Sequence, residues 1–164
     1  MAINALNLLL QIGGEFTFQE RAIPIPPDMR SDYRMAVIVL MLHFCGGRLK
    51  QAPLAKLHVL NWSMRTSASR RAFLDRLDGK LHMRDVPLKF DPGFSRAIDL
   101  AYAERLIERT ASHALALSSQ GMGWVTELLD DTSCLSEERS FLQFVGKRFT
   151  NSALDAILKP SPIW

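Results

Sequence analysis

Residues 91–129 read DPGFSRAIDLAYAERLIERTASHALALSSQGMGWVTELL, and this stretch decides the fold. It begins with Asp91 followed by Pro92, a pair typical of a helix N-cap with proline at the first helical position. Apolar residues then recur at spacings of three and four, which predicts an amphipathic helix from Pro92 to Leu106. Its apolar face comprises Phe94, Ala97, Ile98, Ala101, Tyr102 and Leu106.

Two short segments with strand-like character follow this helix. Residues 106–110 and 113–117 flank a turn at Ala111 and Ser112, and Ser118 or Ser119 can cap a further amphipathic helix. A helix, a short hairpin and another helix in this order are typical of a winged helix. The sequence therefore predicts a mainly α fold, with a winged helix-turn-helix core, a small β wing and extra N- and C-terminal elements.

The segment upstream predicts the buried centre of the fold. Apolar side chains fill nearly every position of residues 35–42, so a helix there is apolar on most sides and belongs inside the core. Ser31 or Asp32 is expected to cap this helix, which should run to about Phe44 and stop at the following Gly-Gly pair.

Two more helices are predicted between this centre and the opening stretch. The first should begin at residues 50–53, with the proline in its first turn, and run to about Met64. Ser67 or Ser69 is expected to cap the second, which should close near Gly79.

The chain is expected to form a single domain over residues 1–164. With 164 residues, of which 48% are hydrophobic and 23% charged, it is long and apolar enough for one ordered core. Its expected parts are an N-terminal arm and extended link at 1–30, the winged-helix core at 31–131 with a basic insertion at 65–89, and C-terminal helices at 132–164, placed at 137–149 and 151–158.

The sequence predicts a cytoplasmic protein with reduced thiols. Cys45 and Cys134 occur without a zinc-ligand spacing, so we expect buried or half-buried free cysteines. The apolar run near the N-terminus lacks a preceding cation and is a poor secretion signal. No segment has the roughly 18 uninterrupted apolar residues that a transmembrane helix requires.

Positive charge is concentrated in the basic insertion. Residues 65–89 hold seven basic residues and three acidic ones, a local excess of four within a net charge of +3. These cations are candidate nucleic-acid contacts, and the alternative is a solvated helix face. They are Arg65, Arg70, Arg71, Arg76, Lys80, Arg84 and Lys89.

The predicted recognition helix lacks the charge of a typical DNA reader. Arg96 and Arg105 are balanced by Asp99 and Glu104, whereas a helix that enters the major groove usually has surplus positive charge. The turn of the predicted wing is short and uncharged. Phosphate binding at the usual winged-helix surface should therefore be weak.

No residue pattern points to catalysis. The candidate bases are the four histidines, of which His43 and His58 lie in apolar helical contexts and His82 and His113 lack an obvious partner. The glycines do not form a phosphate-binding loop, and the carboxylate pairs resemble solvated helix ends. We expect a protein that is not an enzyme, without a metal, a cofactor or a small-molecule substrate.

Apolar residues at both chain ends are candidate docking positions for a partner protein. The alternative is that they pack on the domain itself. The residues are Ile3, Leu6, Leu9, Leu10, Ile163 and Trp164.

Four segments together, spread over about residues 30–130, carry a family resemblance. They are HFCGGR at 43–48, KLHVLNW at 56–62, FDPGFSRAI at 90–98 and LSSQG at 117–121. In order and spacing they resemble the middle components of bacterial ABC-three-component systems, small winged-helix proteins of Lamassu-type antiphage defence.

The resemblance implies a non-catalytic adaptor in a DNA-sensing defence complex. Such a subunit binds an SMC-like or Rad50-like ATPase and links it to an effector subunit, often a nuclease, with at most a weak or indirect DNA contact. The alternative function is a free-standing winged-helix transcription regulator.

Overall fold

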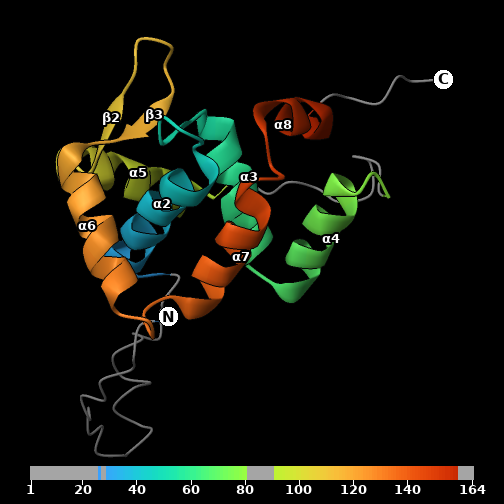
Figure 1. Ribbon diagram of the computed structural model, residues 1–164, viewed down its shortest axis with the longest axis horizontal. Coiled ribbons are helices and arrows are strands. Elements are labelled where there is room, and N and C mark those ends of the chain that lie inside the picture. Colours follow the sequence, from blue (N-terminus) through green and yellow to red (C-terminus); the bar gives the residue numbers. More distant parts are fainter. Residues whose placement is uncertain (1–25, 27–28, 81–90, 159–164) are drawn as a thin grey trace, which may run out of the picture.

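The computed structural model describes residues 26, 29–80 and 91–158, which form a mainly helical fold with a small three-stranded antiparallel sheet (Figure 1). The elements in chain order are α2 (Ser31–Cys45), β1 (Gln51–Ala52), α3 (Leu54–Met64), α4 (Ser67–Leu77), α5 (Pro92–Ala103), β2 (Ile107–Arg109), β3 (Leu115–Leu117), α6 (Ser119–Asp130), α7 (Ser136–Gly146) and α8 (Asn151–Leu158).

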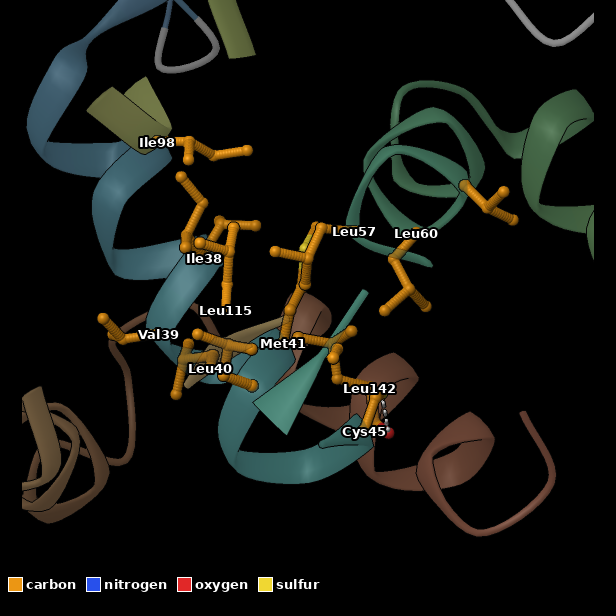
Figure 2. Packing of buried hydrophobic residues seen from close by; sticks show 14 of the residues in the cluster. Ile38, Val39, Leu40, Met41, Cys45, Leu57, Leu60, Ile98, Leu115 and Leu142 are labelled. Carbon is orange, nitrogen blue, oxygen red and sulfur yellow. Dashed lines mark hydrogen bonds between the residues drawn. The ribbon is translucent and has the colours of Figure 1, made fainter. Parts of the chain in front are cut away.

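Helix α2 is the centre of the core, as predicted. Its residues from Ala36 to Leu42 are all buried, and it packs against α5, α6 and α7 and against the sheet. Figure 2 shows its apolar side chains between Leu57 of α3, Leu115 of β3 and Leu142 of α7. Because α2 is surrounded, its sequence is apolar on every side rather than amphipathic.

The predicted cap of α2 is wrong by one or two residues. Arg30 is the N-cap residue and makes no side-chain cap hydrogen bond, so Ser31 and Asp32 already lie inside the first turn. There the Asp32 carboxylate accepts a hydrogen bond from Arg30 at 2.6 Å, and its negative charge lies near the positive end of the helix dipole. The predicted end is confirmed, since Gly47 adopts a left-handed φ of 66°.

The predicted start of the next helix is wrong because residues 51 and 52 form a strand. Lys50 has a φ of 51°, which turns the chain so that Gln51 pairs with Ala116 and Ala52 pairs with Leu115. Pro53 is therefore the N-cap residue, and α3 begins at Leu54. A strand of two residues is recognised only by the strand with which it pairs. That partner, β3, cannot be identified from residues 50–53.

Helix α4 is capped by Thr66, not by Ser67 or Ser69. The Thr66 hydroxyl accepts a hydrogen bond from the backbone N–H of Ser69 at 3.0 Å. The helix is anchored by the fully buried Phe73, whose ring meets the rings of Phe141 and Phe149 edge to face at 6.2 and 5.0 Å. Helix α4 is thus fastened to the region of α7.

Helix α5 begins as predicted and ends earlier. The Asp91 carboxylate accepts hydrogen bonds from the backbone N–H groups of Gly93 and Phe94, which confirms the N-cap. The helix stops at Ala103 instead of Leu106, because Arg105 takes a left-handed φ of 58° and turns the chain into β2.

The predicted hairpin and its following helix are confirmed. Ile107 pairs with Leu117 and Arg109 with Leu115, and the strand order β1-β3-β2 places β3 in the middle of the sheet. The hydroxyl of Ser118 accepts a hydrogen bond from the N–H of Gly121, so Ser118 caps α6.

The two C-terminal helices are present. Helix α8 has the predicted bounds, whereas α7 ends at Gly146 rather than at Phe149. Arg139 of α7 donates hydrogen bonds to the carbonyls of Leu128, Leu129 and Asp131, where α6 ends. The side chain thereby satisfies carbonyls that have no partner inside α6.

Candidate functional site

The structure divides the predicted basic cluster. Arg76 of α4 is only 7% exposed and its guanidinium lies 5.9 Å from the ring of Trp62, while the half-buried Arg70 lies 4.9 Å from the ring of Phe141. Cations stacked on aromatic rings in this way stabilise the attachment of α4 to its neighbours. Arg70 and Arg76 therefore face the protein, not an open surface.

The remaining described cations of this cluster are exposed. Lys80 lies 3.1 Å from Asp78 and 4.0 Å from Asp75, and Asp78 also pairs with Arg148. The hydrogen bonds from Lys80 and Arg148 lower the pKa of the Asp78 carboxyl. Arg65 and Arg71 are exposed and form no ion pair within the described part of the chain.

Several predicted site residues lie outside the described residues. They are Arg84 and Lys89 of the basic cluster, the docking candidates Ile3, Leu6, Leu9, Leu10, Ile163 and Trp164, and His82.

The exposed face of α5 is electrically neutral and partly apolar. Arg96 and Asp99 are both exposed on it, as are Leu100 and Tyr102, the latter with 53% of its surface accessible. Exposed apolar side chains on a helix that also lacks surplus cations favour contact with a protein over contact with a phosphate backbone.

A groove lies between α5, the hairpin and the first turn of α3. It encloses about 290 Å³ and is called the α5–hairpin groove below. Its lining residues are Leu54 of α3, Ser95, Ile98 and Asp99 of α5, and Arg109, His113 and Leu115 of the hairpin region.

The hairpin side of this groove has a defined geometry. Arg109 pairs across the sheet with Leu115, and it lies on the same face of β2 as the buried Ile107 because strand residues two apart share a face. His113 ends the turn with a left-handed φ of 60°. Arg109 therefore lies on the same face of the sheet as the core side chains, and its side chain brings a positive charge to the rim of the groove.

A second cavity, of about 250 Å³, lies between α2, α3 and the start of α5. Arg34 of α2 binds Asp91 there at 3.0 Å, and both side chains are largely buried. Burial alone raises the pKa of the Asp91 carboxyl, but the hydrogen bond and charge of Arg34 and the backbone N–H groups outweigh it, so the pKa lies below 3.8. This ion pair ties α2 to the N-terminus of α5.

The sequence did not indicate how two lysines hold the end of α2. The buried Lys56 donates a hydrogen bond to the carbonyl of Cys45 at 2.8 Å, and Lys50 donates one to the carbonyl of His43 at 2.7 Å. Burial lowers the pKa of Lys56. The only sequence signal is that both cations follow the helix C-terminus, where positive charge is favourable.

The two cysteines are free, as predicted. Cys45 is buried and Cys134 is half-buried. Burial raises the pKa of the Cys45 thiol to about 12, and the thiol donates a hydrogen bond to the carbonyl of Leu142 at 3.7 Å (Figure 2). The described residues contain no cluster of His, Cys, Asp and Glu side chains that could hold a metal ion.

The lowered pKa values of His43 and His58 lead us to expect a loss of stability in acid. Burial lowers the pKa of both imidazoles below 6.5, and the charge of Lys50 lowers that of His43 further, while Asp91 partly opposes the shift at His58. The unfolded chain then binds protons more readily than the folded chain. Each histidine therefore contributes stability that is present above pH 6.5 and is lost as the pH falls through its folded-state pKa.

This expectation can be measured by urea unfolding over a series of pH values. The variants His43→Asn and His58→Asn should each flatten the decline of the unfolding free energy below pH 6.5, and the exposed His113→Asn serves as the control. An unchanged decline in the double variant would contradict the assignment.

Comparison with known proteins identified no relative. No protein-family model matches the chain, and neither the curated proteins nor the solved structures contain a significant match. None of the helices in the described ranges combines the length and the apolar character needed to cross a membrane.

Proposed function

We propose that this protein is a non-catalytic adaptor built on a winged helix-turn-helix core. In this role it links an SMC-like or Rad50-like ATPase to an effector nuclease in a DNA-sensing antiphage defence complex. ATP hydrolysis and DNA cleavage belong to the partners, and this chain supplies surfaces that hold them together.

The order of the elements supports the winged-helix part of the proposal. Helix α2, strand β1 and helix α3 precede α5 in the chain. Helix α5 leads directly into the β2–β3 hairpin, and β3 pairs with β1. This is the arrangement expected if α5 occupies the recognition position and the β2–β3 hairpin is the wing. Helix α4 is then an addition between α3 and α5.

The observation that carries the adaptor role is the chemistry of the surface around α5. In a DNA reader this helix and its wing supply cations and amides to the groove and the phosphates. Here the exposed face of α5 is neutral, and the adjoining groove has Leu54, Ile98 and Leu115 among its lining residues. A surface of this kind is suited to a protein partner.

Co-expression tests this proposal. The full chain is tagged and produced together with a coiled-coil ATPase encoded beside it, and the expected result is a stable complex on size-exclusion chromatography. The absence of such an ATPase gene from the neighbourhood, or a chain that elutes separately from it, would refute the adaptor role.

Exposure of Arg65 and Arg71 favours a second candidate function, a winged-helix transcription regulator. If both arginines neutralise phosphates, DNA binding should weaken with salt at a slope of about −2 in a double-logarithmic plot. The double variant Arg65→Ala and Arg71→Ala should remove this dependence. Tight binding to a palindromic duplex by a dimer of this chain alone would favour the regulator over the adaptor.

A further inference from the structure

We propose that the α5–hairpin groove is the docking site for an acidic segment of a partner protein, which inserts an apolar side chain between α5 and the hairpin. The segment places carboxylates against Arg109 and His113. This inference rests on the proposed adaptor function, since it names the surface and the chemistry by which the chain holds one of its partners.

The apolar floor of the groove calls for an apolar anchor. The floor consists of Ile98 and Leu115, which line the groove and are buried. Leu54, the first residue of α3, also lines the groove and is 45% exposed. The enclosed volume of about 290 Å³ is at the lower limit of small-molecule sites, so it suits one or two side chains better than a metabolite. Covering Leu54 and the floor would remove apolar surface from water.

The charges on the rim set the polarity of the partner. On the hairpin side the charge is that of Arg109, which lies beside His113 and forms no ion pair within the residues that the structure describes. Asp99 lies on the α5 side. A segment whose carboxylates face the hairpin, and whose polar or basic groups face Asp99, matches both sides, so the charges fix its orientation as well.

A nucleic acid matches this groove less well. A phosphate could reach Arg109, but the exposed Leu54 and the apolar floor would remain without an apolar partner. The combination of an apolar floor with a cationic rim is therefore better matched by an acidic peptide.

The groove is preformed. The Thr110 hydroxyl accepts a hydrogen bond from the N–H of Ala114 at 3.1 Å, and the Thr110 N–H donates to the Ala114 carbonyl at 2.9 Å, which closes the hairpin turn. Leu115 lies on the central strand, paired on both sides. A partner that binds here does not have to order the hairpin, which lowers the entropic cost of association.

Selection of short random peptides displayed on phage, with the full chain as the target, tests the groove. The enriched peptides should share an apolar residue beside Asp or Glu. The variant Leu54→Lys should abolish binding of a synthetic copy of the most enriched peptide, and Arg109→Glu should weaken it by about tenfold or more. Leu49→Lys is the matched control, because Leu49 is 70% exposed and does not line the groove.

Charge exchange adds a readout that misfolding cannot imitate. A peptide in which lysines replace the carboxylates should bind Arg109→Glu better than it binds the unsubstituted protein. Peptides without acidic residues, peptides that bind Leu54→Lys normally, or no enrichment at all would overturn the proposal. So would a DNA duplex that binds the groove, recognised by a loss of DNA binding in Arg109→Glu and none in Leu54→Lys.

The groove and the adaptor function can fail separately. If the ATPase complex forms and both Leu54→Lys and Arg109→Glu assemble into it and onto its effector like the unsubstituted protein, the groove assignment is wrong and the adaptor role stands. If no ATPase complex forms while acidic peptides still require Leu54 and Arg109, the groove stands and the adaptor role falls.

Discussion

Replacement of Phe73 by alanine should lower the free energy of unfolding by about 4 kcal/mol, which is the usual range for a fully buried phenylalanine. The Phe73 ring is completely buried and contacts Phe141 and Phe149 edge to face. Its removal leaves a cavity between α4 and the region of α7, and the aromatic contacts are lost in addition to the burial. Urea unfolding followed by circular dichroism measures the change.

Phe144→Ala is the matched control for this experiment. Phe144 lies on α7 as well, but 58% of its surface is exposed and its ring contacts only the guanidinium of Arg148 among the aromatic and cation contacts of the described residues. Its replacement should cost less than about 1 kcal/mol. If the two variants were equally stable, α4 would not be fastened to the core through Phe73.

Replacement of Gly121 by alanine should cost about 3 kcal/mol, in the range of steric strain in a packed interior. A Cβ atom at this position would lie 2.0 Å from the backbone carbonyl oxygen of Leu106, far inside contact distance. The clash cannot be relieved locally, because the N–H of Ser118 donates to that same carbonyl at 3.1 Å and fixes the start of α6 against the residue that precedes β2. The expected readout is a lower midpoint of urea unfolding.

Gly123→Ala provides the opposite result in the same helix. A Cβ atom at Gly123 meets no atom within 4 Å, and glycine inside a helix is less favourable than alanine by about 0.5–1 kcal/mol. This variant should therefore be more stable than the unsubstituted protein. An unchanged stability of Gly121→Ala would mean that α6 does not pack against Leu106 as described, and a loss of stability in Gly123→Ala would mean that the space around Gly123 is not open.

The features that sequence reasoning located correctly depend on neighbouring residues. Asp91 and Pro92 mark the start of α5, and Ser118 marks the start of α6, because a capping side chain bonds to backbone groups two or three residues away. The apolar run within α2 placed it in the core for a similar reason. In each case the residues that decide the structure are contiguous.

The misplaced strand and the misplaced surface cation arose where the partner lies outside the local segment. Gln51 and Ala52 read as a helix start, and they form a strand because β3 is available to pair with them. Arg76 reads as a surface cation, and it is buried because Trp62 offers a ring on which it stacks. Neither partner is adjacent in sequence, so no local pattern announces it.

The sequence by itself determined the helical class, the position of the hairpin and the neutrality of α5, since caps, spacing and charge are properties of single segments. Only the tertiary structure decided which cations are buried and where a surface can receive a partner. The α5–hairpin groove joins Leu54 of α3, Ile98 of α5 and Arg109 of β2, which the packing of the core brings together. Its apolar floor and cationic rim exist only as a combination of distant segments, because each segment alone presents an ordinary helix or strand.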